Sequence, residues 1–304
     1  MEIFNVHVLG CGSAKPTKHR KPSCQVVDVH SKLFMIDCGE AAQMEFARKR
    51  LAMNRLGHIF ISHNHGDHVF GIPGMISTMA LLGRTADLHI HAPQEIEPFL
   101  STVLHTYCEG MDYNVLFHPV PTDTHTLVYE DRSVEVWSIP LEHRIPCCGY
   151  RFCEKPRPPH IRREMLDAFQ IPLSQIGNIK AGASWTTSDG TLIPHDRLTF
   201  PADPPRSYSY CSDTAYKPDI IPFIQGSDLL YHEATYPQCY AHLAGQRGHS
   251  TARQAAQIAH MADVKALIVG HFSARIENEQ ELLSEMMDIF PNSMLASDGM
   301  TIKV

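Results

Sequence analysis

A histidine-rich loop is the feature that most constrains this chain. Residues 63–68 read H-N-H-G-D-H, and they directly follow a short apolar run that is typical of a buried strand. Imidazole nitrogens and carboxylate oxygens are ligands for zinc, and loops at strand ends often carry function. Because these ligand-type side chains lie so close together, the loop can serve two cations. We expect His63 and His65 to hold one of them, and Asp67 and His68 the other.

One loop cannot complete two coordination spheres, so residues from other strand ends must contribute. Three candidates, His143, Asp213 and His271, each stand where a predicted strand gives way to a loop. A bridging carboxylate suits two cations held about 3.5–4 Å apart, and Asp213 is the candidate for that role. Taken singly, each residue would be an ordinary hydrogen-bonded histidine or a turn aspartate. Their shared placement after strands favours a metal site.

Composition bounds the class of protein. With 304 residues, 43% of them hydrophobic and 19% charged, the chain has the make-up of a soluble globular protein, and its apolar runs are too short to cross a bilayer. The first residues show no basic segment followed by an apolar one, so we expect no secretory signal and a cytoplasmic location.

The nine cysteines are scattered, which argues against a disulfide framework and against a thiolate zinc site. The net charge of -7 disfavours a general basic coat for nucleic acid and leaves room only for a local basic patch.

Strands and helices alternate along most of the chain. This alternation is the α/β pattern, in which helices pack on the faces of sheets. Strands are expected at residues 3–9, 25–29, 33–37, 58–62, 88–91, 133–139, 208–212, 229–232 and 266–269. Helices are expected at residues 41–50, 69–82, 95–106, 252–261 and 280–289.

The stretch at about residues 154–205 departs from that pattern. It is rich in proline and weakly periodic, and a structureless loop of that length is unusual in a compact domain. We therefore expect a single domain over residues 1–304 that carries this stretch as an inserted projecting arm. The start of the stretch is basic, which supplies a local patch for an anionic partner; a solvated charged face is the other interpretation. The basic residues are Arg151, Lys155, Arg157, His160, Arg162 and Arg163.

Several motifs together resemble a known family. The H-x-H-x-D-H loop, His143, the Asp213 that follows Ser212, and the His271 that follows Gly270 are similar to the ligand set of the metallo-β-lactamase superfamily. Three further segments resemble ribonuclease Z, the tRNA 3′-processing endonuclease family. They are residues 16–20 (P-T-K-H-R), 232–235 (H-E-A-T) and 249–251 (H-S-T). The similarity runs over almost the whole chain and weakens in the arm.

The resemblance implies a fold, a cofactor and an activity. The fold is a four-layer αββα sandwich, the subunits usually pair as a homodimer, and the arm grips tRNA. The implied metal site takes two Zn(2+) ions per subunit, with the ligands His63, His65, Asp67, His68, His143, Asp213 and His271. The implied function is a zinc-dependent endoribonuclease that hydrolyses a phosphodiester, removes the 3′ trailer from precursor tRNA and leaves a 3′-hydroxyl on the tRNA.

Catalytic roles follow from what phosphodiester hydrolysis needs. Zinc ions lower the pKa of a water molecule and take up charge on the phosphate. Asp67 is placed to orient that water and accept its proton, so it is the expected general base. The ribose 3′-oxygen is a poor leaving group, and His249 held by Glu233 fits the need for a proton donor. Alternatively, His249 precedes a helix capped by Ser250 or Thr251, and Glu233 binds backbone amides; similarity to the family's H-S-T segment favours the catalytic role.

Three cations are candidate phosphate contacts near the metals: Lys18, Arg20 and Arg275. Each is equally well explained as a surface charge. The chain departs from the family where Lys21 stands in place of an asparagine and Ile276 in place of an aromatic residue, and its arm has no Gly-Pro-rich tip. These departures bear on the grip on tRNA and leave the metal ligands intact.

Two rival functions remain open. The first is another hydrolase on the same metals, such as a phosphodiesterase of the metallo-β-lactamase fold that acts on cyclic nucleotides or other small phosphodiesters, or a thioester hydrolase. The basic insertion favours a large anionic substrate instead. The second is an RNA-binding scaffold that keeps the fold without the metals; the competent residue at every ligand position argues against it.

Overall fold

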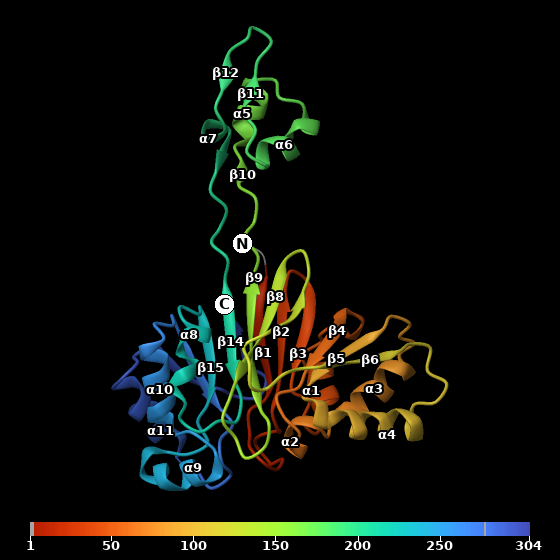
Figure 1. Ribbon diagram of the computed structural model, residues 1–304, viewed down its shortest axis with the longest axis vertical. Coiled ribbons are helices and arrows are strands. Elements are labelled where there is room, and N and C mark those ends of the chain that lie inside the picture. The colour runs from red at the N-terminus through yellow and green to blue at the C-terminus, as the bar shows by residue number, and fades with distance from the viewer. Residues whose placement is uncertain (1–2, 277) are drawn as a thin grey trace. The chain divides into compact units, whose positions relative to one another are not determined.

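Figure 1 shows the protein as a computed structural model that describes residues 3–276 and 278–304. Contacts within the chain separate it into two compact units. The larger unit, here called the body, comprises residues 3–153 and 206–304, and the smaller one, called the arm, comprises residues 154–205. Each unit has a hydrophobic core of its own.

Two seven-stranded sheets form the centre of the body. The first has the order β18-β1-β2-β3-β4-β5-β6, with β1 Phe4–Gly10, β2 Cys24–Val29, β3 Lys32–Ile36, β4 Leu56–Phe60, β5 Leu88–Ala92, β6 Val115–Pro119 and β18 Thr301–Lys303. The second has the order β17-β16-β15-β14-β9-β8-β7, with β7 Leu127–Glu130, β8 Val134–Pro140, β9 Cys148–Glu154, β14 Ser207–Cys211, β15 Leu229–Glu233, β16 Leu267–Gly270 and β17 Ser293–Leu295. Strands β3 to β6 are parallel to one another, as are β14 to β17. Parallel strands end at the same edge of a sheet, so the loops that follow them gather there.

The two sheets pack face to face through large apolar side chains. Phe34 and Phe60 of the first sheet lie against Phe152 of the second, with ring centroids 5.7 and 5.5 Å apart, respectively. These rings are fully buried, and their tilted and edge-on contacts are the arrangements that aromatic pairs prefer. The strands of the parallel regions read as continuous apolar runs because both of their faces are covered.

Helices cover the outer face of each sheet, which gives the four layers αββα (Figure 1). On the first sheet lie α1 (Ala42–Arg48), α3 (Ile72–Leu81) and α4 (Glu97–Tyr107). On the second lie α8 (Ile221–Ile224), α10 (Ala252–Met261) and α11 (Glu279–Met287). Two short helices, α2 (Gly66–Val69) and α9 (Ala241–Arg247), lie in the loops beyond the strand ends. The αββα sandwich implied by the resemblance is therefore the fold of the body.

Most expected elements are present, but the helix expected at residues 69–82 is broken. Gly71 lies between α2 and α3. A Cβ at Gly71 would lie 2.1 Å from the Gly39 carbonyl oxygen, so the two backbone segments meet too closely for a side chain. The expected helix at 252–261 is α10, and it begins with a capping box in which Thr251 and Gln254 each accept from the other's backbone N–H.

The arm is a small unit with short elements. Its backbone forms β10 (His160–Ile161), α5 (Arg163–Ala168), α6 (Ile176–Lys180), β11 (Trp185–Thr186), β12 (Leu192–Ile193), α7 (His195–Leu198) and β13 (Thr199–Phe200). Strand β10 pairs with β13, and β11 with β12. Four buried side chains form its core: Ile171, Ile179, Ile193 and Leu198.

Several basic residues expected at the start of the arm have structural partners. Arg151 belongs to the body, where its guanidinium donates to the carbonyl oxygens of Phe223 and Gln225 at 2.9 and 3.0 Å. Within the arm, Arg157 pairs with Glu154 at 2.7 Å, and Arg162 donates to the Thr199 carbonyl at 3.0 Å. Arg163 is exposed.

Two further expectations concern membranes and disulfides. No helix in the described part of the chain has the length and apolar character needed to span a bilayer. All nine cysteines are free thiols.

Candidate metal centre

The functional side chains lie at one edge of the sandwich, where strands of both sheets end. His63 follows β4, His143 follows β8, Asp213 follows β14 and His271 follows β16. The structure thus brings together all seven side chains that the sequence analysis assigned to metal binding, as two groups that share Asp213.

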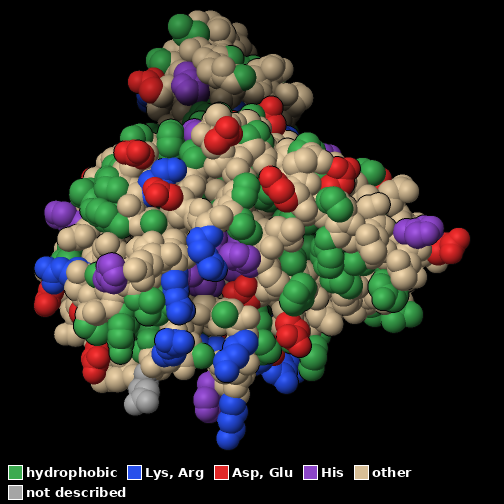
Figure 2. All heavy atoms as spheres, turned by 60° about the horizontal axis from the view of Figure 1, so that its bottom comes forward, with side chains coloured by type: hydrophobic (Ala, Val, Ile, Leu, Met, Phe, Trp, Pro, Cys, Tyr) green, Lys and Arg blue, Asp and Glu red, His purple; other side chains and the backbone are tan. Residues whose placement is uncertain are grey.

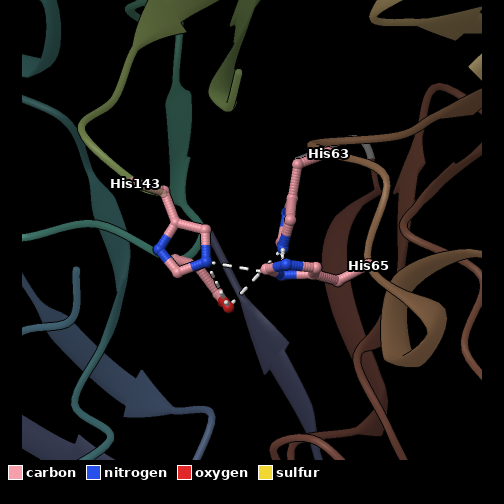
Figure 3. Close-up of side chains that lie close together, drawn as sticks. His63, His65 and His143 are labelled. Atoms are coloured by element: carbon pink, nitrogen blue, oxygen red, sulfur yellow. Dashed lines mark hydrogen bonds and ion pairs between the residues drawn. The ribbon is translucent and has the colours of Figure 1, made fainter. Parts of the chain in front are cut away.

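The first group consists of three histidines and one oxygen of Asp213. His63, His65 and His143 point toward one another from the two sides of the sandwich edge (Figure 3). His63 Nε2 lies 2.9 Å and His143 Nε2 3.3 Å from His65 Nδ1. Asp213 Oδ2 lies 3.6 Å from His63 Nε2 and 3.9 Å from His143 Nε2. Four nitrogen and oxygen atoms around one point form a set that zinc can take.

The second group consists of Asp67, His68, His271 and the other oxygen of Asp213. His271 Nε2 lies 3.4 Å from Asp67 Oδ2 and 3.2 Å from Asp213 Oδ1. His68 Nε2 lies 3.6 Å from each of the same two carboxylate oxygens. Because Asp213 turns one oxygen to each group, it has the placement that a bridging ligand requires.

Hydrogen bonds from the opposite ring nitrogen orient four of the five histidines. The Nδ1 atoms of His63, His68, His143 and His271 lie 2.7 to 2.9 Å from the Ser62 hydroxyl, the Asp37 carboxylate, the Gly248 carbonyl and the Thr235 hydroxyl, respectively. Such outer partners fix the ring orientation and leave Nε2 free for a metal. His65 instead turns Nδ1 toward the group.

Two buried atoms test whether the site fits a metal. His68 Nε2 and Asp213 Oδ1 form no hydrogen bond with any residue that the structure describes. A buried polar atom that forms no hydrogen bond costs free energy, so a ligand that satisfies both atoms is expected here. The burial that lowers the pKa of His63 keeps it a neutral imidazole, the form that binds zinc. Burial alone would lower the pKa of His68 too, but the carboxylates of Asp37, Asp67 and Asp213 raise it to about 10, which marks a position that attracts positive charge.

Three backbone positions at the site have left-handed conformations. Ala14, Asp37 and His271 have φ angles of 62°, 55° and 61°. Such conformations of non-glycine residues cost about 1–3 kcal/mol each and persist where surrounding contacts hold them. Here Ala14 donates its N–H to Asp67 Oδ2 at 2.7 Å, Asp37 accepts from Ser62, and His271 faces both carboxylates. The strain therefore coincides with the alignment of the ligand set.

Glu233 and His249 form a second pair beside the metal ligands. His249 Nδ1 lies 2.8 Å from Glu233 Oε1, and Glu233 also accepts from the backbone N–H groups of Thr214, Thr235 and Ser250 at 2.9 to 3.1 Å. Glu233 thus both holds His249 and binds backbone amides, and the proton-donor role of His249 stays a prediction. Burial opposes charge on both groups, yet their mutual attraction lowers the pKa of Glu233 and raises that of His249. With Nδ1 bound to Glu233, the Nε2 atom of His249 is the one available to the cavity that the residue lines.

A cavity of about 880 Å³ opens over the candidate metal ligands. His65, Asp67, Asp213, His249 and His271 line its floor. Its basic lining residues are Lys15, Arg144, Arg247 and Arg275. Figure 2 shows Lys and Arg side chains gathered around histidines on the face turned forward. This distribution favours an anionic ligand, although the whole chain carries a net charge of -7.

The three expected phosphate contacts are placed differently from one another. Arg275 lines the cavity. Lys18 is exposed on the loop before β2, and Lys15 of the same loop is among the lining residues. The Arg20 guanidinium donates to the carboxylate of Glu279, to Cys11 Sγ at 2.7 Å and to the Ala296 carbonyl at 3.2 Å. These contacts give it a structural role, because they connect separate loops.

Sequence reasoning missed the residues that hold the ligands in place. Asp37 accepts hydrogen bonds from the backbone and hydroxyl of Ser62 and from the Tyr210 hydroxyl, and it orients His68. The signal that could have found it is the one that found His143: a polar residue directly after an apolar strand. Thr235 lies in the H-E-A-T segment, but the resemblance gave its hydroxyl no role, and Gly248 carried no signal, because the contacts of both depend on the folded chain.

Comparison with known proteins connects the chain to named relatives. It is 52% identical over 304 residues to a protein named ribonuclease Z from Parabacteroides distasonis, covering 100% of both chains. It is 53% identical over 304 residues to a ribonuclease Z from Bacteroides thetaiotaomicron, covering 100% of this chain and 96% of the other. The sequence model of the family described as "Anti-Pycsar protein Apyc1" matches residues 4–136.

Solved structures share the fold. The short form of human tRNase Z superimposes with a TM-score of 0.72 at 24% identity, covering 98% of both chains. The metallo-β-lactamase fold protein YhfI from Bacillus subtilis superimposes with a TM-score of 0.71 at 18% identity, covering 100% of both chains. These matches confirm the metallo-β-lactamase fold.

Proposed function

The chain belongs to the ribonuclease Z family, and from this premise we propose that it is a metal-dependent endoribonuclease that removes the 3′ trailer from precursor tRNA. The observation that carries this conclusion is the 52% identity to a ribonuclease Z over all 304 residues of both chains. The reaction is hydrolysis of one phosphodiester. Water adds to the phosphorus, the bond to the ribose 3′-oxygen breaks, and the tRNA keeps a 3′-hydroxyl while the trailer keeps the phosphate.

We propose two zinc ions as the cofactor. His63, His65 and His143 would hold one, Asp67, His68 and His271 the other, and Asp213 would contribute one oxygen to each. When bound, such a pair of ions supplies an activated water at neutral pH and cancels negative charge on the phosphate.

Two side chains would move the protons. Burial alone would raise the pKa of Asp67, but the neighbouring His68 and His271 hold it well below its usual range, so Asp67 is a carboxylate. Its Oδ2 is fixed by the Ala14 N–H, and it lines the cavity floor, where it can orient the attacking water and accept a proton. His249 would deliver a proton from Nε2 to the departing 3′-oxygen, while Glu233 fixes its ring through Nδ1.

The substrate would be held mainly through charge. Lys15, Arg144, Arg247 and Arg275 line the cavity and can neutralise phosphates next to the scissile one without reading sequence. We further propose that the arm contacts the folded part of tRNA, through exposed cations such as Arg163. Assembly as a homodimer and a cytoplasmic location stay predictions from the sequence.

Metal analysis joined to a cleavage assay tests the function. The purified protein is expected to contain zinc, to cut a precursor tRNA once at the base of the trailer, and to lose activity on chelation and regain it with zinc. Cyclic nucleotides and a small aryl phosphodiester serve as competing substrates. Efficient hydrolysis of those small substrates with precursor tRNA left intact would establish the small-molecule phosphodiesterase instead.

A further inference from the structure

A second cavity adjoins the one over the metal ligands. It has a volume of about 510 Å³, within the range of about 300–1,000 Å³ that is typical of small-ligand pockets. Tyr236 and Arg275 line both cavities, so the two lie side by side. The remaining lining includes Pro237, Tyr240 and Leu243, which form an aromatic and apolar wall, and the polar side chains of Asn278 and Glu281.

The two tyrosines have different roles in this wall. Tyr236 is 5% exposed and receives a hydrogen bond on its hydroxyl from Arg247 at 3.2 Å, so it is a fixed partition. Tyr240 is 55% exposed. The two rings are 6.4 Å apart at 56°, so a flat ligand stacked on Tyr240 meets Tyr236 at an angle. Tyr240 is the available stacking face.

The segment that carries Tyr240 is anchored at its start. The backbone N–H of Gln238 donates to the carboxylate of Glu285 on α11 at 3.0 and 3.1 Å, and its side chain accepts from the Thr251 hydroxyl at 2.8 Å. The N–H of Tyr240 itself donates to the Pro237 carbonyl at 3.0 Å. The pocket wall is thus preformed, which lowers the entropy cost of binding.

The position of His249 tells which part of an RNA would reach this cavity. Tyr236 packs edge-on against His249, with ring centroids 6.2 Å apart. His249 serves the leaving 3′-oxygen, whereas Asp67 lies on the side of the attacking water. The second cavity therefore adjoins the leaving-group side of the scissile bond.

We propose that this second cavity holds the base of the nucleotide whose 3′-oxygen leaves, stacked on Tyr240, with Arg275 beside its phosphate. This assignment rests on the proposed tRNA-trimming function. Base-on-aromatic stacking tolerates any base, so the pocket positions the last nucleotide that the tRNA keeps without selecting its identity.

A binding experiment without turnover tests the pocket. A tRNA that ends in the 3′-hydroxyl of the cleaved product carries 2-aminopurine as its last base, whose fluorescence falls on stacking. The wild-type protein and Tyr240→Phe are expected to quench the probe, while Tyr240→Ala is expected to leave it bright and to bind about tenfold more weakly. Tyr107→Ala, which removes another exposed tyrosine on α4, is the matched control and is expected to behave as wild type. Equal quenching by wild type and Tyr240→Ala would overturn the proposal.

Abasic substrates then locate the base. Tyr240→Ala is expected to lower kcat/KM for precursor tRNA about tenfold, and to have no further effect when the last retained nucleotide lacks its base. The penalty is expected to persist when the first trailer nucleotide is abasic instead, and the reverse pattern would refute the assignment. If the wild-type protein leaves precursor tRNA intact, the proposed function fails; if it cleaves and Tyr240→Ala cleaves equally well, the pocket alone fails.

Discussion

The metal centre and the arm are built in opposite ways. At the centre, the rings of His63, His68, His143 and His271 are each fixed by a hydrogen bond at Nδ1. The arm has strands of two residues and a core of four buried side chains. Chemistry needs atoms placed within about half an ångström, whereas charge contacts with a nucleic acid backbone tolerate far looser placement. The difference predicts that changes at the centre affect every substrate and that changes in the arm affect only a large one.

Asp213→Ala should have the largest effect, because it removes an oxygen from both groups of ligands. Turnover of precursor tRNA and of a small aryl phosphodiester should both fall by about 10³-fold or more, with loss of bound metal. Steady-state kinetics and metal analysis measure this. Asp219→Ala, an exposed carboxylate of the body, is the control. Full activity on either substrate would contradict the bridging role.

His249→Ala should separate substrates by their leaving groups. Cleavage of precursor tRNA should slow by about 10²-fold, because the 3′-oxygen needs a proton, and an activated aryl phosphodiester should be much less affected. His242→Ala, an exposed histidine on α9, controls for loss of an imidazole. Equal slowing of both substrates would exclude the proton-donor role.

Removal of the arm should also separate the two substrates, but through substrate binding instead of leaving-group chemistry. A variant in which a short flexible linker replaces residues 156–200 should lose more than about tenfold in kcat/KM for precursor tRNA, through KM, while its hydrolysis of the small phosphodiester stays unchanged. The body has a separate core, so the variant should still unfold cooperatively and its zinc content should match wild type. Cleavage of precursor tRNA at the wild-type rate by this variant would contradict the prediction that the arm serves the large substrate.

Gly248→Ala should show how tightly the centre is fitted. Gly248 has a φ of +69°, and an added Cβ would lie 2.9 Å from His143 Nδ1. Gly226 has a φ of +65° and open space around it, so Gly226→Ala carries the backbone cost of about 1–2 kcal/mol without the clash. Both variants should lose thermal stability, but only Gly248→Ala should also lose metal affinity. Equal metal affinity in the two would mean that His143 adjusts freely.

The smallest effect is expected from two cations of the arm. Arg163 and Lys180 line one groove of the arm. Replacement of both by alanine should reduce the magnitude of the slope of log affinity for tRNA against log salt concentration by about two. Hydrolysis of the small substrate should not change. Glu164→Ala in the same groove is the control and should not lower that slope. An unchanged slope would show that these side chains do not contact phosphate.

The fold and the ligand positions were largely predictable because both depend on local pattern. Apolar runs locate strands, and a polar residue just after a strand must lie at the sheet edge; this rule placed His143, Asp213 and His271 beside the first loop. The resemblance of the motifs to the metallo-β-lactamase superfamily then gave the αββα order of layers. The partners of each ligand were not predictable, since they depend on which ring nitrogen faces inward.

Contacts between distant segments were also beyond the sequence. Arg20 was a candidate phosphate contact, but Glu279, 259 positions later, lies against its guanidinium. Likewise, the expected helix at 69–82 breaks because Gly39 of an earlier loop crosses at Gly71. A linear pattern carries no information about such neighbours.

The division of the ligands between the sheets has a mechanical consequence. His63, His65, Asp67 and His68 come from the loop of the first sheet, and His143, Asp213 and His271 come from loops of the second. Ions bound among them would cross-link the two sheets, so separation of the sheets on unfolding would require release of the ions. By linkage, free metal at 100 times its dissociation constant would add about 2.7 kcal/mol against unfolding for one ion. The same ions would then stabilise the packing of the two sheets and support the reaction, so a shortage of metal would lower both stability and activity.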